Sequence, residues 1–310
     1  MEVIKSDNFN NLNIGPVVLA VGTFDGIHLG HQAVINRAKE IAENYNLPLG
    51  VYTFHPHPLE VLKPAIAPKS IISLRQKIEI LSNFNLDYYL EQKFTSDFAR
   101  MDYKTFVKDF LVERFKVSHL VVGEDFHLGN KGEGNVENIK KIGSRLGFEV
   151  TGLDSVKKDS KRISSTRIRT LIDEGKIAKI TDYLGRYYRL DGRVIRGMGR
   201  GHKLGIPTAN LKPDTDYVLP PSGVYACYVL YKGKKYRGIV NFGNNPTFAG
   251  TSYSIEVHIF EFEYEDIYQQ RISVDLVEFI REEMTFNSPE KLVEQIKKDI
   301  LYTESLLCYN

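Results

Sequence analysis

The clearest chemical signal in the sequence is the segment from Gly22 to His31, which reads Gly-Thr-Phe-Asp-Gly-Ile-His-Leu-Gly-His. It follows an apolar run and precedes a stretch of helical period, and a helix N-terminus offers free backbone N–H groups and a favourable dipole to a phosphate. His28 and His31, with Gly30 between them, can both donate to a triphosphate and, as imidazolium, neutralise charge on a leaving pyrophosphate. The alternative is a strand-to-helix turn with surface histidines.

A second candidate for anion binding is the segment 163–169, with the sequence Ile-Ser-Ser-Thr-Arg-Ile-Arg. The hydroxyls of Ser164 and Ser165 and free backbone N–H groups begin a helix, and Arg169 follows one turn later. We expect this segment to face the first one as a second anion cradle. Serine is also an ordinary helix cap, so the segment alone leaves a structural role open.

Between Gly197 and Asn210 the chain combines a glycine-rich flap with the sequence Pro-Thr-Ala-Asn. It lacks the lysine–serine/threonine ending of a Walker A loop. The Thr208 hydroxyl and the Asn210 carbonyl are hard oxygen ligands suited to a Mg²⁺ ion that phosphates already bridge. A surface hairpin without a ligand is the alternative. The candidate phosphate-binding residues in this stretch are Gly197, Gly199, Gly201, Lys203 and Gly205.

The composition limits the kind of molecule that carries these segments. With 310 residues, 42% of them hydrophobic and 26% charged, the chain is neither collagen-like nor wholly disordered. Its length predicts two domains, each with its own core. The formal net charge of +2 provides no polycation field, so we expect no nucleic-acid partner and expect anions to be bound locally.

Cysteine content and hydropathy indicate where the chain resides. Cys227 and Cys308 are its only cysteines, too few for a disulfide framework or a four-cysteine zinc site. We therefore expect a reducing, cytoplasmic location. No apolar run approaches the roughly 18 residues that span a bilayer, and residues 1–10 lack the apolar block of a signal peptide, so we expect no membrane association.

The first half of the chain alternates apolar runs with stretches of helical period. This alternation is typical of a doubly wound parallel sheet, whose ligand crevice lies at the carboxyl ends of the strands. The expected strands are 16–21, 49–54, 88–90 and 119–122. The expected helices are one with an apolar face from Val34 to Tyr45, and 73–84, 103–115 and 136–146.

After Gly185 the pattern changes to period-two alternation with glycine turns, which indicates an antiparallel sheet. We predict a closed β-barrel followed by a C-terminal helix with Ser288 as its N-cap. The expected strands are 223–231, 235–242, 254–263 and 271–280, and two helices, 165–174 and 177–184, precede the barrel. The predicted domains are 1–184 and 185–310.

The segment from Gly22 to His31 resembles the nucleotidyltransferase signature of the bifunctional bacterial riboflavin kinase/FAD synthetases. The segments 53–58, 123–129 and 163–169 resemble further motifs of this family. The resemblance implies ATP or phosphate binding by Gly22, Phe24, Asp25, Gly30, Ser164, Ser165 and Arg169. It implies flavin or nucleotide contacts for His57, Asp125 and Phe126. Leu128 stands where the family usually has a second aromatic residue, so the packing of the flavin ring or adenine stays open there.

The segment 197–210 resembles the flavokinase signature of the same family, and 241–247 resembles its companion motif. The resemblance implies phosphate binding by Asn241 and assigns Glu256 as the catalytic base that accepts a proton from the 5′-hydroxyl of riboflavin. From its alternating strand alone, Glu256 could equally be an outward-facing glutamate.

Two positions of the flap depart from the family pattern. Arg196 replaces a common histidine, and His202 replaces a common arginine. Both replacements keep a side chain that can be cationic, so we expect the affinity for phosphate to change and the kinase activity to be retained.

The resemblance spans nearly the whole chain and implies two reactions on small-molecule substrates. The barrel phosphorylates riboflavin with ATP to give FMN, and the N-terminal domain transfers AMP from a second ATP to FMN, giving FAD and pyrophosphate. Mg²⁺ is expected in both sites because each transition state carries several phosphate charges.

Two other interpretations remain. The N-terminal domain could adenylylate or cytidylylate a different phosphate, for which Leu128 leaves room. The chain could instead be a flavin sensor or RNA-binding regulator that uses the basic segments 157–169 and 193–203. The small net charge argues against the regulator, as does the overlap of these segments with the phosphate motifs.

Overall fold

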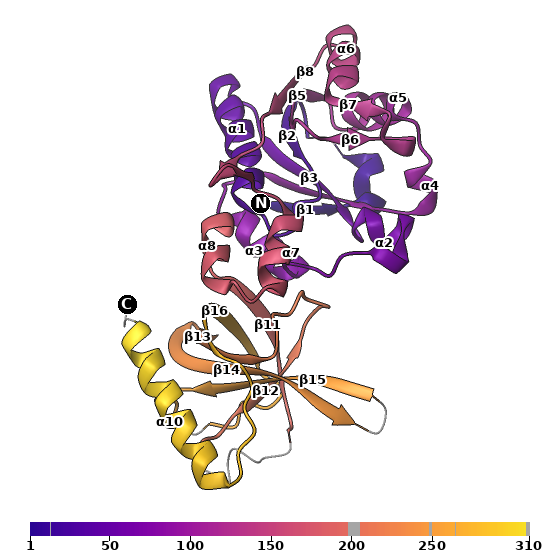
Figure 1. Ribbon diagram of the computed structural model, residues 1–310. Helices are drawn as coiled ribbons and strands as arrows, with labels where there is room; N and C mark the ends of the chain where they lie inside the picture. The colour runs from indigo at the N-terminus through magenta and orange to yellow at the C-terminus, as the bar shows by residue number, and fades with distance from the viewer. Residues whose placement is uncertain (13, 198–204, 248–249, 264, 308–310) are drawn as a thin grey trace. The chain divides into compact units, whose positions relative to one another are not determined.

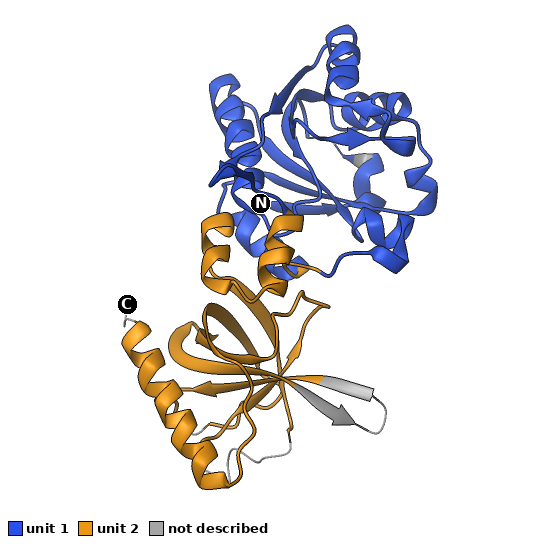
Figure 2. Cartoon of the chain, viewed as in Figure 1, with its two compact units in different colours: residues 1–69, 74–164 blue, residues 70–73, 165–310 orange. Residues whose placement is uncertain are grey.

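The computed structural model describes residues 1–12, 14–197, 205–247, 250–263 and 265–307. Their contacts divide the chain into two compact units, which Figure 2 draws in separate colours. Unit 1 comprises Met1–Lys69 and Leu74–Ser164, and unit 2 comprises Ser70–Ser73 and Ser165–Asn310. Within the described residues, no helix combines the length and the apolar character that crossing a membrane requires.

Unit 1 is built around a sheet of six parallel strands in the order β1-β4-β3-β2-β5-β8 (Figure 1). The sequence predicts the inner four strands, and the structure adds β1 and β8 at the two edges. The strands are β1 (Glu2–Lys5), β2 (Val17–Val21), β3 (Leu49–His55), β4 (Tyr88–Lys93), β5 (Val117–Gly123) and β8 (Glu149–Leu153).

Helices connect these strands. The predicted helix 103–115 begins as α5 (Tyr103–Phe106) and continues as a π-helical segment, η3 (Val107–Arg114). The other helices of unit 1 are α1 (Leu29–Tyr45), α2 (Pro58–Leu62), α3 (Leu74–Ser82), α4 (Ser96–Ala99) and α6 (Val136–Leu146), with short 3₁₀ turns at Ser6–Asn11, Pro64–Ile66 and Asn130–Gly132. Two small hairpins pair β6 (His127–Leu128) with β7 (Gly134–Asn135), and β9 (Lys157–Lys158) with β10 (Lys161–Arg162).

Strand β2 shows how the sheet buries both of its faces. Leu19 and Val21 belong to an apolar cluster that includes Phe110 of η3. Val18 and Ala20 are equally buried but point to the opposite face, because successive side chains of a strand alternate. Helix α1 packs against β2 and β5 outside that cluster and covers this second face. The doubly wound fold predicted from the sequence is confirmed.

Unit 2 contains a closed barrel of six antiparallel strands in the order β11-β12-β15-β14-β13-β16. The barrel closes because β16 pairs with both β13 and β11. The predicted closed barrel is therefore confirmed. Its strands are β11 (Tyr188–Ile195), β12 (Ala209–Pro213), β13 (Gly223–Tyr231), β14 (Lys234–Thr247), β15 (Gly250–Ile259) and β16 (Arg271–Arg281).

Among the described residues of unit 2, three helices and one short remote segment accompany the barrel. The helices are α7 (Ser165–Asp173), α8 (Ile177–Leu184) and α10 (Pro289–Leu306). Ser288 caps α10 by accepting a hydrogen bond from the Lys291 N–H, as the sequence predicts. The segment Ser70–Ser73 joins this unit through a parallel bridge between Ser70 and Tyr217. The domain boundary at residues 184 and 185 stays a prediction.

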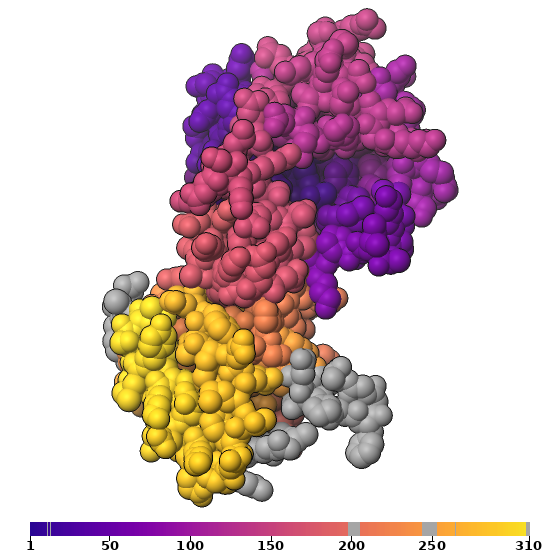
Figure 3. Space-filling model, in the orientation of Figure 1, coloured from indigo at the N-terminus to yellow at the C-terminus, as the bar shows by residue number. Residues whose placement is uncertain are grey.

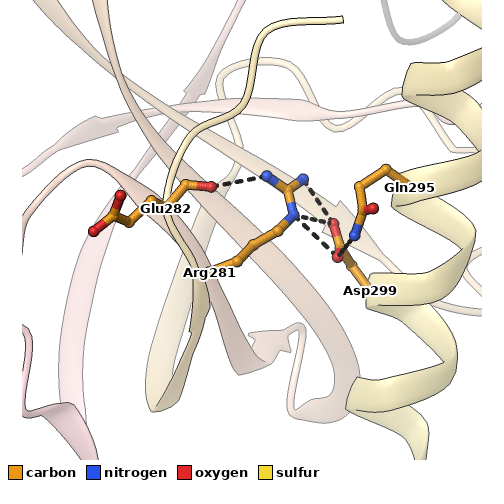
Figure 4. Close-up of polar contacts among 4 residues, drawn as sticks. All are labelled: Arg281, Glu282, Gln295 and Asp299. Carbon is orange, nitrogen blue, oxygen red and sulfur yellow. Dashed lines mark hydrogen bonds and ion pairs between the residues drawn. The ribbon is translucent and has the colours of Figure 1, made fainter.

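Helix α10 is fastened to the barrel by a buried ion pair (Figure 4). Asp299 of α10 is 3% exposed and accepts hydrogen bonds from the guanidinium of Arg281, at the end of β16, at 2.8 to 3.1 Å. Gln295, one turn earlier on α10, donates to the same carboxylate at 2.9 Å. The guanidinium also donates to the carbonyl oxygen of Glu282 at 2.9 Å. Both oxygens of the Asp299 carboxylate thus accept hydrogen bonds, Oδ1 from Arg281 and Gln295 and Oδ2 from Arg281.

The substitution Asp299→Ala should destabilise the barrel strongly, because it leaves the Arg281 guanidinium buried without its carboxylate. Removal of one partner from a buried pair typically costs about 3–5 kcal/mol of unfolding free energy. Urea unfolding of the full chain measures this loss. Glu294→Ala is the matched control, since Glu294 on the same helix forms an exposed pair with Lys298, and loss of an exposed pair should change the stability little. Equal losses in the two variants would show that Asp299 does not anchor the helix.

Candidate active sites in the two units

The first motif occupies the turn that joins β2 to α1, at the carboxyl end of a central strand of the sheet. Phe24 and Ile27 have positive φ angles of 47° and 39°, in the region that side chains rarely adopt. Asp25 is buried within the turn. Gly22 lies under the Phe24 ring, where a Cβ would stand 3.3 Å from the ring. The turn is therefore a compact structure with a specific backbone path.

The two histidines stack on each other in the first turn of α1. Their ring centroids are 3.7 Å apart, with 13° between the ring planes. His28 is the N-cap of the helix, and its Nδ1 accepts a hydrogen bond from the His31 N–H at 3.2 Å. This bond leaves the proton of a neutral His28 on Nε2, where it can be donated to a ligand. A Cβ at Gly30 would stand 3.1 Å from the His28 ring, so a glycine suits this position.

His31 carries a buried Nδ1 atom that has no hydrogen-bond partner among the described residues. Burial, the neighbouring His28 and the Lys77 ammonium together hold the pKa of His31 well below its usual range. The ligand-free protein therefore contains a neutral His31 at neutral pH. An imidazolium at this position, as the sequence analysis expects, requires a ligand whose negative charge raises that pKa.

The remaining candidates in unit 1 follow the carboxyl ends of β3 and β5. His57 caps α2, and its Nδ1 accepts from the Leu59 N–H at 3.2 Å. Asp125 forms an ion pair of 2.5 Å with Arg162, and Phe126 packs partly buried against the core of unit 1. Figure 3 shows a hollow in unit 1, with indigo residues from the start of the chain on its floor and the violet segment around α2 along one side. Leu128 is buried in the core.

The segment 163–169 is divided between the two units. Ile163 and Ser164 belong to unit 1, and the Ile163 carbonyl oxygen lies 3.6 Å from the position that a Cβ would take at Gly30. The head of this segment thus lies against the histidine motif. Ser165 and Arg169 belong to α7 of unit 2. Their approach to the histidines remains a prediction.

In unit 2, three neighbouring strands bring their candidate residues into one row. Glu256 of β15 stands opposite Asn210 of β12 on one side and Asn241 of β14 on the other. Side chains that are directly opposite on antiparallel strands project from the same face, so a carboxylate lies between two amides. The Thr208 hydroxyl donates to Oε2 of Glu256 at 3.4 Å. These four residues form one polar group on the barrel.

His258 is a residue of this site that the sequence analysis did not single out for a role. It lies two positions after Glu256 on the same face of β15, and its Nδ1 donates to the Pro207 carbonyl at 2.8 Å. Burial lowers the pKa of His258 below its ordinary value, and the bond to Pro207 opposes this. His258 thereby holds the Pro-Thr-Ala-Asn turn against the strand that carries Glu256.

The glycine-rich flap is described only at its two ends. A Cβ at Gly197 would collide with the side-chain amide of Asn210, so glycine is required for this approach. Gly205 has a φ of 73°, a conformation that favours glycine. The guanidinium of Arg196 lies over the Tyr268 ring. The candidates Gly199, Gly201, His202 and Lys203 lie outside the described residues.

The donor chemistry of the barrel site suits a hard cation. Thr208 and Asn210 offer a hydroxyl and an amide oxygen, and the Glu256 carboxylate lies beside them. Such neutral and anionic oxygens are the ligands that Mg²⁺ takes when phosphates complete its coordination. The residues present therefore fit the metal that the sequence analysis expects in the barrel.

Comparison with known proteins identifies the family of the chain. Residues 11–167 match the family model described as FAD synthetase, and residues 184–307 match the one described as riboflavin kinase. A bifunctional riboflavin kinase/FMN adenylyltransferase from Listeria monocytogenes is 38% identical over 96% of this chain and 93% of its own. The chain belongs to the bifunctional riboflavin kinase/FMN adenylyltransferase family. The family and the two activities expected from the sequence are thus confirmed.

Further matches extend over both units of the chain. A protein of the same name from Bacillus subtilis is 38% identical over 91% of this chain and 90% of its own. A crystal structure of a protein named macrolide-efflux protein, from Streptococcus pneumoniae, is similar over 97% of this chain and 98% of its own, with a TM-score of 0.87 and 30% identity. The whole fold of this family member therefore occurs in a solved structure.

We predict that ATP binds at the histidine motif of unit 1 and that this binding takes up a proton at His31, because the triphosphate favours the imidazolium. His31 is neutral before binding, so the affinity for ATP at this site should rise as the pH falls from the bound pKa towards the lower free pKa. Calorimetry in buffers of different ionisation enthalpy measures the uptake. His31→Gln should lose the part of the uptake that belongs to this site. Equal uptake by the variant and the natural protein would contradict the assignment.

Proposed function

We infer that the chain makes FAD from riboflavin in two ATP-dependent steps, with the kinase in the barrel and the adenylyltransferase in unit 1. One observation carries this inference. The family matches cover both units in order, and each unit contains its own group of candidate catalytic residues.

In the kinase step, Glu256 accepts the proton of the riboflavin 5′-hydroxyl as that oxygen attacks the γ-phosphate of ATP. The products are FMN and ADP. The Thr208 hydroxyl, which donates to Glu256, orients the carboxylate. We propose that Asn241, which lies opposite Glu256 in the barrel, donates from its amide to a phosphate. The glycines of the flap let backbone N–H groups reach the same phosphates.

In the adenylyltransferase step, a phosphate oxygen of FMN attacks the α-phosphate of ATP, and pyrophosphate leaves. The nucleophile is already an anion, so this site needs positioning and charge stabilisation rather than a general base. Nε2 of His28 donates to the triphosphate, and His31 neutralises the leaving pyrophosphate once ATP has raised its pKa. Backbone N–H groups of the turn from Gly22 to Gly30, with Ser164, Ser165 and Arg169, bind the remaining phosphate oxygens.

Further contacts in unit 1 are proposed for the substrates. His57, Asp125 and Phe126 follow the carboxyl ends of β3 and β5, where a parallel sheet binds its ligands. Phe126 offers a partly buried aromatic face to a flavin or adenine ring. Leu128 is a buried member of the apolar cluster against which Phe126 packs.

Mg²⁺ is the proposed metal of both steps, with Thr208 and Asn210 as its protein ligands in the barrel. When bound, it neutralises the phosphate charge that builds up in each transition state. We also propose a cytoplasmic location, supported by the low cysteine content. The partners are the small-molecule substrates, and the small net charge favours a protein that does not bind nucleic acid.

A time course with riboflavin, ATP and MgCl₂, resolved by chromatography, tests the proposed function. FMN should appear first and FAD should follow, and chelation of Mg²⁺ by EDTA should stop both. If FMN forms but FAD does not, even when FMN is supplied, then the assignment of FMN adenylylation to unit 1 is wrong. The phosphate that unit 1 accepts would then have to be identified anew. If no FMN forms from riboflavin but FAD still forms from supplied FMN, then the assignment of riboflavin kinase activity to the barrel is wrong.

A further inference from the structure

Lys77 of α3 extends an ammonium group to the backbone of the turn that carries the histidine motif. Its Nζ donates to the carbonyl oxygen of Thr23 at 2.8 Å. The same oxygen accepts a hydrogen bond from Oγ1 of Thr53 at 3.2 Å, and Thr53 is fully buried on β3. One carbonyl near the start of the turn is therefore held by two donors, from a helix and from a strand.

The ammonium group of Lys77 lies in an environment where burial disfavours its charged form. Burial lowers the pKa of Lys77, and the carboxylates of Asp25 and Glu91 oppose that shift. Both carboxylates are buried, and the hydroxyl of Tyr89 donates to Glu91 at 3.2 Å. A lysine that is desolvated and balanced by specific charges is a typical feature of functional sites.

The turn that Lys77 holds cannot keep its shape by local preference alone. Phe24 and Ile27 both have positive φ angles, which cost free energy for residues with a side chain. Such a conformation persists when the surrounding structure fixes it. The bonds from Lys77 and Thr53 supply that constraint next to Phe24, and the Gln32 side chain supplies another by donating to the Ile27 carbonyl at 2.9 Å.

We propose that Lys77 is a positioning residue of the adenylyltransferase. By fixing the Thr23 carbonyl, Lys77 orients the N–H groups of the turn and the imidazole of His31 towards the triphosphate of ATP. The proposal rests on the proposed function, because it assigns the turn to ATP. Lys77 acts through the backbone of the turn and does not itself touch the reacting atoms. A misplacement of about 1 Å in such a site can cost about 10²-fold in rate.

The test compares Lys77→Met with Arg75→Met, both assayed in the full chain. Arg75 is an exposed cation on the same helix and is the matched control. With FMN and ATP supplied, Lys77→Met should lower kcat/KM for ATP by about 10²-fold, with a raised KM for ATP and an unchanged KM for FMN. Lys77→Arg, which keeps a cationic donor, should recover part of this loss. Formation of FMN from riboflavin should be unchanged in all three variants.

A merely structural role would give a different result. Loss of folded enzyme lowers kcat and leaves both KM values as they were, and this result would overturn the proposal. An unchanged KM for ATP in a folded Lys77→Met would do the same. If Lys77→Met does not fold, Thr53→Val removes the other donor to the same carbonyl, and its KM for ATP must then rise. Absence of FAD formation by the natural protein would instead refute the proposed function.

Discussion

Glu256→Gln is expected to stop the formation of FMN from riboflavin while leaving the formation of FAD from supplied FMN intact. The amide keeps the size of the side chain and can still accept from the Thr208 hydroxyl, so the barrel should keep its fold. It cannot accept the proton of the 5′-hydroxyl. Loss of a general base typically costs about 10²–10⁴-fold in kcat. The rate of FMN formation at saturating riboflavin and ATP measures the effect.

Glu265→Gln is the control for loss of a carboxylate from unit 2. Glu265 is exposed and pairs with Lys232 at 2.5 Å, away from the row of Asn210, Glu256 and Asn241. It should leave both activities unchanged. Retention of FMN formation by Glu256→Gln at the natural rate would show that Glu256 is not the base and would restore its interpretation as an outward-facing glutamate.

His28→Asn should have the opposite effect and halt the pathway at FMN. Asparagine is a good N-cap, so the start of α1 should remain capped although the imidazole is gone. The loss of one donor to the charge that develops in a transition state typically costs about 10²–10³-fold in kcat. The measurement is the rate of FAD formation from FMN and ATP, with FMN formation by the same sample as the internal control.

Comparison with His28→Ala separates the two functions of this residue. Alanine removes the imidazole and the cap together, so this variant should be less stable to heat than His28→Asn and equally slow in FAD formation. If His28→Asn forms FAD as fast as the natural protein and His28→Ala does not, then the contribution of His28 is structural. That result would contradict its role as a donor to the triphosphate.

Local patterns in the sequence predicted the elements that carry the sites, because these elements depend on local signals. The helix that begins within the first motif, the strand 223–231 and the capped C-terminal helix all have clear periodicity or capping residues. The spacing of His28 and His31 predicted that they act together, but the stacking of their rings was not predicted.

Features that depend on distant contacts were not predicted. Strand β1 has one buried residue, Ile4, and is an edge strand only because β4 lies beside it. The segment Ser70–Ser73 joins unit 2 because Ser70 pairs with Tyr217, which no local pattern indicates. The predicted helix 103–115 becomes π-helical in η3, where Phe115 N–H bonds to the Phe110 carbonyl, five residues back.

The part played by Lys77 was also missed, although the sequence contains a signal for it. Lys77 lies three residues after Leu74 and four before Leu81, so it shares the helical face of the apolar stripe. An ionisable residue at such a position must find polar partners in the interior. Its partners, Thr23 and the carboxylates of Asp25 and Glu91, come from other elements and appear only in the folded chain.

If one chain carries two separate sites, two variants that are each inactive at a different site should complement each other when they are mixed. Glu256→Gln and His28→Asn, each given riboflavin, ATP and MgCl₂ alone, should form no appreciable FAD. Their mixture should form FAD, because FMN released by His28→Asn is adenylylated by Glu256→Gln. Accumulation of FMN in the mixture without FAD, or full FAD formation by either variant alone, would contradict the assignment of the two reactions to these two sites.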